Sequence, residues 1–350
     1  MNNGKLKVVH ILALGGYSGA ENVVVSIIQG TEDFCDSIYL SPHGEIDDIL
    51  KEKKISHYPM DDMNIFSIRK AIRKISPDII HAHDFNNSVK SAIAIRGIPI
   101  ISHLHNNPPW IKRVSVKSVS YLVTARKYSQ ILTVSDSVSE EYVFGRFIRK
   151  KIKMIGNPVN IKSIIDKVNS HKAVNRRQIA FLGRLSPPKN PISFLHIVHD
   201  VKNVFHDIQA VIIGDGELRK DVEEAIHALG LTDNVQCRGF IKNPYNILRE
   251  STLLCMTSDW EGFGLAAVEA LTLGVPVVCR CVGGLRDIVN SECGYLCDSD
   301  KAITDGVLSI LSNDDIYIKL SEGALSRARE LDNYDVYLEE IKDIYTVLST

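Results

Sequence analysis

The sequence alternates short apolar runs with longer stretches whose apolar residues recur at helical spacing. In the first half, runs rich in valine, isoleucine and leucine predict strands at residues 6–13, 37–41, 78–83, 99–104 and 131–135. Their apolar character is too continuous for strands that expose one face to water. The pattern therefore favours a parallel sheet covered by helices on both sides.

The same rhythm restarts in the second half. It predicts strands at residues 179–182, 210–213, 235–237, 253–256 and 275–279, with helices between them, as at residues 217–229. The polar, proline-marked segment 156–178 separates the two series and is typical of an interdomain linker. From about residue 300 only helical spacing remains. We expect an α/β protein of two doubly wound Rossmann-like domains facing a cleft, with ligands at the carboxyl ends of the strands.

Composition excludes several classes of protein. The 350 residues, 45% hydrophobic and 24% charged, are typical of a soluble globular chain with room for two cores. No apolar run is long enough to cross a bilayer, and the apolar stretch 8–14 contains a histidine and leads into glycines. We therefore predict no signal peptide, no membrane span and a cytoplasmic location. The seven cysteines lack zinc-site spacing and indicate reduced packing thiols.

Charge is unevenly distributed along a chain whose formal net charge is −1. Residues 63–156 hold 16 Lys/Arg against 5 Asp/Glu, and segments 111–127 and 146–154 contribute ten of these basic residues. The first of these segments mixes its basic residues with valines. A basic amphipathic helix can contact an anionic membrane from the cytoplasmic side, and a solvated surface face is the alternative. No aromatic interleaving accompanies the charge, so we expect no nucleic-acid partner.

The stretch EGFGLAAVE holds two glutamates, Glu261 and Glu269. A continuous helix would separate them by about 12 Å along its axis, outside the roughly 5 to 9.5 Å used by the paired carboxylates of glycoside hydrolases. Gly262 and Gly264 favour a loop at Glu261 and a helix that begins near Gly264. The free N–H groups at that helix end predict an anion site, such as one for a diphosphate. The alternative is a capping glutamate followed by a packed one.

Other loops carry related chemistry. Arg184 and Lys189 follow a strand in FLGRLSPPKN. An arginine and a lysine in such a loop can bind phosphates, and the alternative is that they are two ordinary surface cations. Gly214 follows a strand in VIIGDGELRK. The N-terminal LALGGYSGAENVV, with Gly16, lacks G-x-G-x-x-G spacing, which disfavours a Rossmann dehydrogenase.

In the order GRLSPPKN, GDGELRKDVEEAIHALGLTDNVQCRGF, SDWEGFGLAAVEALTLGVPVV and VGGLRDIV, these segments resemble the retaining glycosyltransferases of family 4, which have the glycosyltransferase-B fold. GGYSGAENVV, DIIHAHD and ISHLHN resemble the family's amino-terminal elements more weakly. The resemblance implies an acceptor-binding domain at 1–160, a donor-binding domain at 161–330, and a helix at 331–350 that packs back toward the first domain.

The resemblance also assigns roles on the donor side. Glu261 would face the transferred sugar and Glu269 would bind the ribose hydroxyls, while Arg184 and Lys189 would neutralise the diphosphate without a metal or other cofactor. The remaining donor-binding residues that the resemblance implies are Gly16, Gly214, Phe240, Phe263, Gly264 and Leu265. We expect a UDP- or GDP-sugar.

On the acceptor side, the resemblance places His105 near the transferred sugar, with His83 and Asp84 lining the acceptor pocket. Two pairs of histidines, His81/His83 and His103/His105, are each spaced two residues apart on a predicted strand, so the members of a pair point to the same face. Packed histidines are commoner than a four-histidine metal site. The predicted activity is transfer of a hexose to a glycan or lipid-linked saccharide in lipopolysaccharide, O-antigen or capsule synthesis. The alternatives are a sugar-nucleotide 2-epimerase of the same fold and a non-catalytic glycosyltransferase-like subunit.

Overall fold

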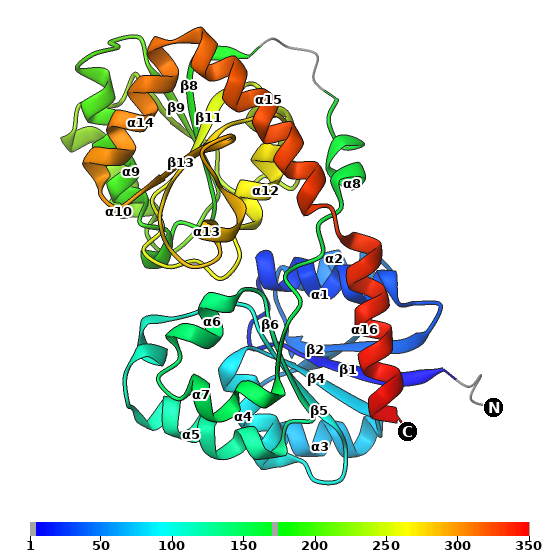
Figure 1. Cartoon of the computed structure of the whole chain (residues 1–350). Helices are drawn as coiled ribbons and strands as arrows, with labels where there is room; N and C mark the ends of the chain where they lie inside the picture. Colours follow the sequence, from blue (N-terminus) through cyan, green and yellow to red (C-terminus); the bar gives the residue numbers. More distant parts are fainter. Residues whose placement is uncertain (1–4, 170–173, 350) are drawn as a thin grey trace. The chain divides into compact units, whose positions relative to one another are not determined.

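The computed structural model describes residues 5–169 and 174–349 (Figure 1). The chain divides into two compact units. The first unit is Met1–Pro158 with Asn333–Thr350, and the second unit is Val159–Asp332. The predicted divisions lay at 160/161 and 330/331. No helix among the described residues is both long and apolar enough to cross a membrane, and the seven cysteines are all free thiols.

The first unit contains a parallel sheet of seven strands in the order β3-β2-β1-β4-β5-β6-β7. The strands are β1 (Leu6–Ile11), β2 (Cys35–Pro42), β3 (Ser56–Met60), β4 (Ile79–His83), β5 (Ile100–Leu104), β6 (Gln130–Thr133) and β7 (Ile152–Met154). The helices are α1 (Gly19–Gly30), α2 (Ile46–Glu52), α3 (Ile65–Ile75), α4 (Asp84–Ala94), α5 (Val116–Thr124), α6 (Asp136–Glu141), α7 (Gly145–Ile148) and α16 (Tyr334–Ser349), with short 3-10 turns η1 (Pro109–Lys112), η2 (Ala125–Lys127) and η3 (Arg149–Lys151).

The second unit contains a parallel sheet of six strands in the order β10-β9-β8-β11-β12-β13. The strands are β8 (Asn175–Leu182), β9 (Gln209–Ile213), β10 (Val235–Cys237), β11 (Ser251–Met256), β12 (Val277–Arg280) and β13 (Gly294–Cys297). The helices are α8 (Ile161–Ile165), α9 (Pro191–Lys202), α10 (Arg219–Ala228), α11 (Tyr245–Arg249), α12 (Leu265–Thr272), α13 (Leu285–Ile288), α14 (Asp300–Ser312) and α15 (Asp314–Leu331), with one 3-10 turn, η4 (Pro187–Lys189).

Both sheets reverse the direction in which strands are added. The reversal falls between β1 and β4 in the first unit and between β8 and β11 in the second. At such a point the neighbouring loops separate to opposite sides of the sheet, which leaves a crevice at the carboxyl ends of the strands. The prediction of two doubly wound α/β domains is confirmed, and the crevice of each unit is where its functional residues should be sought.

Three strands were missed by the prediction: β3, β7 and β13. Each lies at an edge of its sheet. An edge strand is partly exposed, so its sequence need not be continuously apolar, and β3 even contains Pro59. The predicted linker 156–178 was also wrong in part, because α8 lies inside it and β8 already begins at Asn175. The polar start of β8 is explained by Arg176 and Arg177, whose guanidinium groups lie over the rings of Tyr317 and Phe205.

The last helix, α16, belongs to the first unit, where it contacts α1 and β4. Its buried side chains are Tyr337, Leu338, Ile341, Ile344 and Tyr345. Leu338 occupies the space beside Gly30, where a Cβ atom would lie 2.3 Å from a Leu338 methyl group. The chain therefore leaves the first unit, builds the second, and returns to complete the core of the first.

We expect Ile341→Ala to lower the free energy of unfolding by about 2–5 kcal/mol, because Ile341 is fully buried and its truncation leaves a cavity. Val347→Ala on the same helix is the matched control, since Val347 is 72% exposed, and should change stability by no more than about 0.5 kcal/mol. Urea unfolding of both variants in a Trp260→Phe background, followed by the fluorescence of Trp110 in the first unit, measures both effects. Equal effects of the two substitutions would show that α16 is not docked.

Candidate functional site

In the second unit, the predicted donor-side residues gather at the carboxyl ends of four adjacent strands. Phe240 follows β10, Gly214 follows β9, Arg184 and Lys189 follow β8, and the segment 261–269 follows β11. Strand order therefore brings together loops that are up to 85 positions apart in the sequence. Lys189 and Glu261 lie on the two sides of the reversal between β8 and β11.

The loops after β8 and β11 are tied together directly. The Lys189 ammonium forms an ion pair with Glu261, which also accepts a hydrogen bond of 3.3 Å from the Ser258 hydroxyl. The backbone N–H of Asp259 donates to the Pro188 carbonyl at 2.8 Å, and the Thr257 hydroxyl donates to the Asn190 carbonyl at 2.8 Å. Lys189 and Glu261 are mostly buried, with side chains 26% and 12% exposed. Their geometry is thus fixed by the backbone of both loops.

Arg184 and Gly214 form the next part of the edge. The Arg184 guanidinium is 55% exposed and donates to Glu217 at 3.1 Å. Gly214 has a φ of +143°, and a Cβ atom there would lie 2.0 Å from the Gly183 carbonyl oxygen. The N–H of Gly214 donates to the Gly239 carbonyl at 2.8 Å. Only glycine allows the loops after β9 and β8 to approach this closely.

Phe240 immediately follows this contact, and its ring is 58% exposed. An exposed aromatic ring beside a tightly packed glycine turn offers a stacking surface for a planar ligand.

Helix α12 begins where the sequence predicts. Gly264 caps it with a φ of +109°, which favours glycine, and the helix runs over Leu265–Thr272. The N–H groups of Ala267 and Val268 donate to the Gly264 carbonyl, so the helix itself leaves those of Leu265 and Ala266 available at its N-terminus. Phe263 packs against the core of the second unit. A helix N-terminus, a lysine and an arginine at one strand edge favour an anionic ligand.

Glu269 lies one turn into α12. Its carboxylate accepts a hydrogen bond of 3.2 Å from the Tyr245 hydroxyl. Burial raises the pKa of Glu269 to about 7, while the Tyr245 hydrogen bond and the charge of Lys167 act in the opposite direction. A carboxyl held near the middle of its titration at neutral pH can accept hydrogen bonds from ligand hydroxyls once it is ionised.

In the first unit, the acceptor-side residues also lie at the carboxyl edge of the sheet. Asp84 follows β4 with a φ of +66°, which is unusual for a residue with a side chain. Its carboxylate accepts the backbone N–H of His105 at 3.3 Å and the Asn106 amide at 3.2 Å. Burial raises the pKa of Asp84 to about 7. His105 Nε2 lies 2.9 Å from His83 Nδ1, so the structure brings all three predicted residues together.

Gly16 lies in the loop after β1, at the same edge. A Cβ atom at Gly16 would meet nothing within 4 Å, whereas one at neighbouring Gly15 would lie 2.2 Å from the His43 carbonyl oxygen. Packing therefore requires glycine at Gly15 but not at Gly16. Because Gly16 has no side chain and faces open space, a ligand could approach the backbone closely there.

Sequence reasoning missed three groups that contact the predicted residues. Tyr245 and Glu217 pair with Glu269 and Arg184, and no local motif marks either of them. His10 was also missed. It lies on β1 directly opposite His81 of β4. Comparing the positions of histidines across adjacent predicted strands could have found it.

Two Rossmann-like units, each with its polar residues at the carboxyl edge of a parallel sheet, are the architecture of the GT-B fold. Two solved structures have the same fold: HepE from Anabaena, crystallised with UDP and glucose, superimposes with a TM-score of 0.85 at 20% identity, over 97% of this chain and 99% of that chain. WaaG, a glycosyltransferase involved in lipopolysaccharide biosynthesis, gives a TM-score of 0.75 at 13% identity, over 97% and 99%.

Sequence comparison places the chain more narrowly. Residues 9–163 match the family described as Glycosyltransferase Family 4, and residues 163–327 match that described as Glycosyl transferases group 1. The chain belongs to the retaining glycosyltransferases of family 4, which confirms the resemblance seen in its motifs.

The chain is similar to several curated proteins. One is an α-1,4-N-acetyl-D-galactosaminyltransferase of Campylobacter jejuni that acts on an undecaprenol-PP-linked glycan (25% identical, 98% of this chain and 99% of the relative). Another is a UDP-Gal:α-D-GlcNAc-diphosphoundecaprenol α-1,3-galactosyltransferase of Escherichia coli (24%, 98% and 97%). An uncharacterized glycosyltransferase of Methanocaldococcus jannaschii is 27% identical over 67% of this chain and 63% of its own length.

The raised pKa of Glu269 leads to a prediction about how the free energy of unfolding depends on pH. Between pH 4.5 and 7 the unfolded chain loses this proton while the folded protein keeps it, so the contribution of Glu269 to the free energy of unfolding falls as the pH rises through that window. Glu269→Gln removes the ionisable group. We expect the variant to be more stable than the wild type at pH 8, by on the order of 1–3 kcal/mol, with a smaller gain at pH 5.5.

Urea unfolding at both pH values measures this gain. Glu224→Gln is the control, because Glu224 is 67% exposed on α10 and should give the same small effect at both pH values. A gain for Glu269→Gln that did not change with pH would contradict the burial of a protonated carboxyl.

Proposed function

We propose that the protein transfers a hexose from a UDP-sugar to a hydroxyl of an undecaprenyl diphosphate-linked saccharide, with retention of anomeric configuration and without a divalent metal. The reaction belongs to the assembly of a cell-surface polysaccharide such as lipopolysaccharide, O-antigen or capsule. The second unit binds the donor and the first unit binds the acceptor.

The observation that carries this proposal is the pairing of Lys189 with Glu261 across the reversal of the second sheet. This pair sets a cation for the diphosphate beside a carboxylate for the sugar, next to Arg184 and the N-terminus of α12. The two cations and the helix end supply the positive charge that a metal ion supplies in other transferases. Lys189 and Arg184 are each paired with a glutamate, so a bound diphosphate would compete for them or share them.

The other donor contacts follow from position along the same edge. Glu269 accepts hydrogen bonds from the ribose hydroxyls, the Phe240 ring packs near the base, and the backbone at Gly214, Phe263, Gly264 and Leu265 approaches the sugar and phosphates. UDP is the expected nucleotide because HepE was crystallised with UDP and the E. coli relative is named for UDP-Gal.

Transfer proceeds by attack on the same face from which the nucleotide leaves. The acceptor oxygen forms a bond to the anomeric carbon, the bond from that carbon to the β-phosphate oxygen breaks, and the acceptor proton passes to the departing phosphate. Lys189 and Arg184 stabilise the charge on the released UDP. His105, with His83 and Asp84, positions the sugar and the acceptor hydroxyl.

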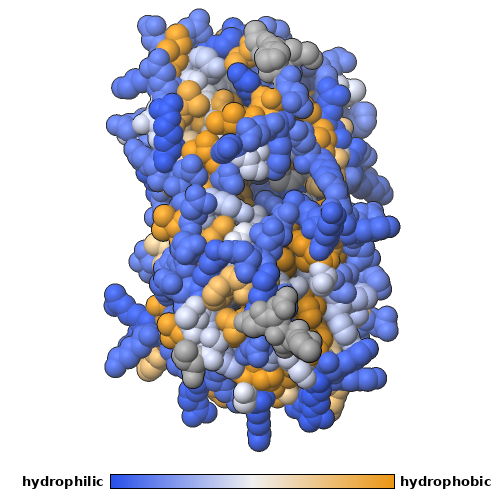
Figure 2. Space-filling model, turned by 90° about the vertical axis from the view of Figure 1, so that its right-hand side faces the viewer, coloured by the Kyte–Doolittle hydropathy of each residue, from blue (hydrophilic) through white to orange (hydrophobic). Residues whose placement is uncertain are grey.

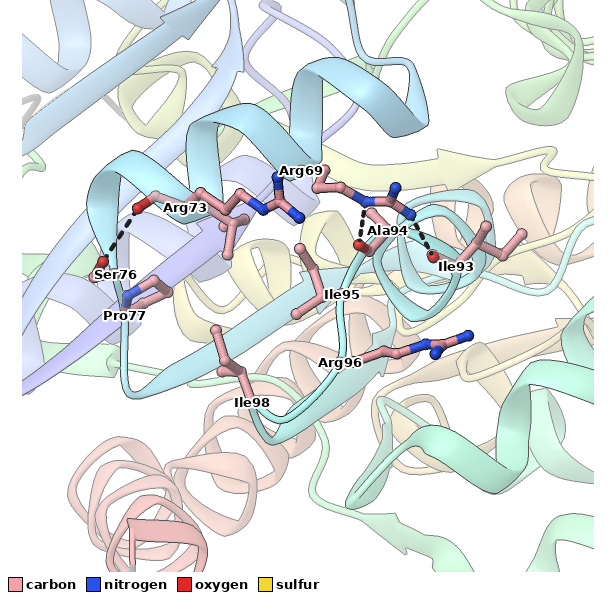
Figure 3. Close-up of a pocket in the computed structure, with 10 residues that line it drawn as sticks. Arg69, Arg73, Ser76, Pro77, Ile93, Ala94, Ile95, Arg96 and Ile98 are labelled. Atoms are coloured by element: carbon pink, nitrogen blue, oxygen red, sulfur yellow. Dashed lines mark hydrogen bonds between the residues drawn. The ribbon is translucent and has the colours of Figure 1, made fainter.

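A lipid-linked acceptor is supported by the two bacterial relatives, whose names include undecaprenol carriers. It is also supported by basic surface in the first unit. A hollow of about 670 Å³ between α3 and α4 is lined by Arg69, Arg73 and Arg96 together with isoleucines (Figure 3). Arg69 donates to the carbonyls of Ala94 and Ile93. Arg73 and Arg96 are exposed, and no side chain among the described residues pairs with them.

The basic segments at 111–127 and 146–154 also belong to the first unit. They do not form long helices, and consist instead of α5, α7, short 3-10 turns and β7. Val116, Val119 and Val123 of α5 are exposed at 84%, 40% and 54%. One face of the molecule is shown in Figure 2, where hydrophobic residues form separate patches among hydrophilic ones. Basic side chains around exposed apolar ones suit the surface of an anionic membrane.

Two alternatives make different predictions. A 2-epimerase would convert its UDP-sugar without an acceptor, and a non-catalytic subunit would bind the donor without turnover. The E-x7-E context of Glu261 and Glu269 favours transfer over epimerisation, and the ion pair of Lys189 with Glu261 argues against a subunit that has lost its site.

The direct test incubates the protein with a panel of UDP-sugars and undecaprenyl diphosphate-linked saccharides, in the presence of EDTA, and measures UDP release and the mass of the product. We expect acceptor-dependent UDP release. Lys189→Ala should reduce kcat/KM by roughly 10- to 100-fold, the cost of losing a hydrogen bond to a charged group. Lys220→Ala is the control, since Lys220 is 87% exposed and makes only a weak surface ion pair.

Conversion of the donor without any acceptor would favour the epimerase. Donor binding without conversion by any acceptor of the panel would favour the non-catalytic subunit. Equal activity of the two lysine variants would contradict the assignment of Lys189.

Membrane contact is tested by flotation with vesicles. We expect binding to vesicles that contain phosphatidylglycerol, and little binding to phosphatidylcholine alone. The double variant Arg73→Glu/Arg96→Glu should lose much of the bound fraction, because each basic residue near an anionic surface contributes about 1 kcal/mol. Lys220→Glu/Lys319→Glu reverses two exposed charges of the second unit as a control. Equal losses in both double variants would indicate non-specific charge attraction.

A further inference from the structure

Five histidines lie together inside the first unit, on one face of its sheet. They are His10 on β1, His81 and His83 on β4, and His103 and His105 on β5 and immediately after it. Register explains the grouping, because His10 is paired with His81 and His83 is paired with His103 across adjacent parallel strands. Neighbouring rings are in contact, with centroid distances of 4.1 Å for His103–His105 and 4.4 Å for His81–His83. This histidine cluster is at most 9% exposed at any member.

Hydrogen bonds organise the histidine cluster into two short chains. In one, the Tyr345 hydroxyl of α16 lies 2.7 Å from His81 Nδ1, and His81 Nε2 lies 3.1 Å from His103 Nδ1. In the other, His10 Nδ1 lies 3.1 Å from His83 Nε2, and His83 Nδ1 lies 2.9 Å from His105 Nε2. Burial lowers the pKa of all five imidazoles, so each is neutral and carries one N–H and one lone pair.

The hydrogen bonds within the histidine cluster leave buried ring nitrogens unused. His103 Nε2, His105 Nδ1 and His10 Nε2 have no hydrogen-bond partner among the described residues. The second chain has three neutral imidazoles and two internal hydrogen bonds, so one N–H at one end and one lone pair at the other remain unsatisfied in either direction of the chain. An unsatisfied buried polar group typically costs about 1–3 kcal/mol. A ligand that takes up lone pairs here would remove part of that cost.

We propose that His83, His103 and His105 bind one Zn²⁺ ion. One ring nitrogen from each of the three lies within 4.8 Å of one from each of the others. Tetrahedral zinc with Zn–N bonds of 2.0–2.1 Å needs nitrogens about 3.3 Å apart, so side-chain rotation would bring the three nitrogens to three of the four positions, and a water molecule would take the fourth. His10, His81 and His83 meet the same distance criterion, but in that set only His10 keeps a ring nitrogen without a hydrogen-bond partner among the described residues, whereas both His103 and His105 keep one. His83 would exchange its hydrogen bond with His105 for a bond to the metal.

The surroundings of these three histidines have the second layer that zinc sites require. His83 can donate its Nε2–H to His10, and His103 can donate its Nδ1–H to His81, which Tyr345 holds in turn. Such partners fix the tautomer and the ring orientation of a metal ligand. Asp84 lies beside His105 and Glu21 is a second buried carboxyl close to Asp84. Their negative charges would offset the charge of the buried ion.

The metal would join β4 and β5, and two of its ligands, His83 and His105, are also proposed acceptor-side residues. This ion would be bound in the first unit and not at the diphosphate, so it is compatible with metal-free donor binding, and metal binding can be measured separately from transfer. The ion's role would be to hold His105 and His83 in a fixed orientation.

The test uses the full chain, purified without a histidine tag and stripped with a chelator. Co²⁺ replaces Zn²⁺ as a visible probe and is added both to the native protein and during refolding from urea. We expect one Co²⁺ per chain, the visible absorption of tetrahedral Co²⁺, displacement of that absorption by Zn²⁺, and a thermal unfolding temperature that rises with Zn²⁺ concentration.

His103→Gln removes one ligand and should weaken Co²⁺ binding by more than 100-fold. His81→Gln removes only a second-layer partner and should weaken it by about 10- to 100-fold. His196→Gln, at an exposed histidine of α9, is the control and should bind as the wild type does. Absence of Co²⁺ absorption in the wild type under both conditions would overturn the proposal, whatever the variants do. Binding that survives equally in His103→Gln would also overturn it, by placing the metal elsewhere.

Discussion

The burial of both faces of each parallel sheet is the constraint on which the rest of this structure depends. Helices cover the sheets, so polar chemistry is placed chiefly where strands end and loops begin. The reversal of strand order then opens one crevice per sheet, between β8 and β11 in the second unit and between β1 and β4 in the first. Every predicted site residue lies at or next to these edges. His10, His81 and His103 of the histidine cluster depart from this rule, because their rings are buried inside the first unit, where His81 contacts Tyr345 of α16.

At the donor edge, the ion pair of Lys189 with Glu261 joins the loop after β8 to the loop after β11. The Asp259 N–H donates to the Pro188 carbonyl and the Thr257 hydroxyl donates to the Asn190 carbonyl, so the same two loops are held together and the cation and the carboxylate are placed before a ligand binds. Preorganised charge of this kind stabilises a leaving diphosphate more effectively than mobile side chains would. Burial has an unfavourable consequence at Glu269. It raises the pKa of this carboxyl to about 7, so its ionised form is destabilised at neutral pH.

Much of this organisation could be predicted from the sequence, because parallel strands and their helices have strong periodic patterns. The nine central strands, the edge strand β10, the start of α12 near Gly264 and the family followed from local motifs. The other three edge strands, β3, β7 and β13, could not be predicted, since partial exposure removes their apolar signature. The partners of the site residues, such as Tyr245 for Glu269 and Glu217 for Arg184, also escaped prediction. They come from distant segments, and only the fold brings them together.

The central claim is that the carboxyl edge of the second unit binds a nucleoside diphosphate through Arg184 and Lys189 without a metal. Thermal stabilisation by UDP, GDP, ADP and dTDP, measured with EDTA present and repeated on Arg184→Ala, tests it most directly. The account predicts that UDP stabilises the protein, by about 2.7 kcal/mol at a hundred times its dissociation constant, and that the variant loses most of this effect. Stabilisation by none of the four nucleotides, or an unchanged response of the variant, would contradict it.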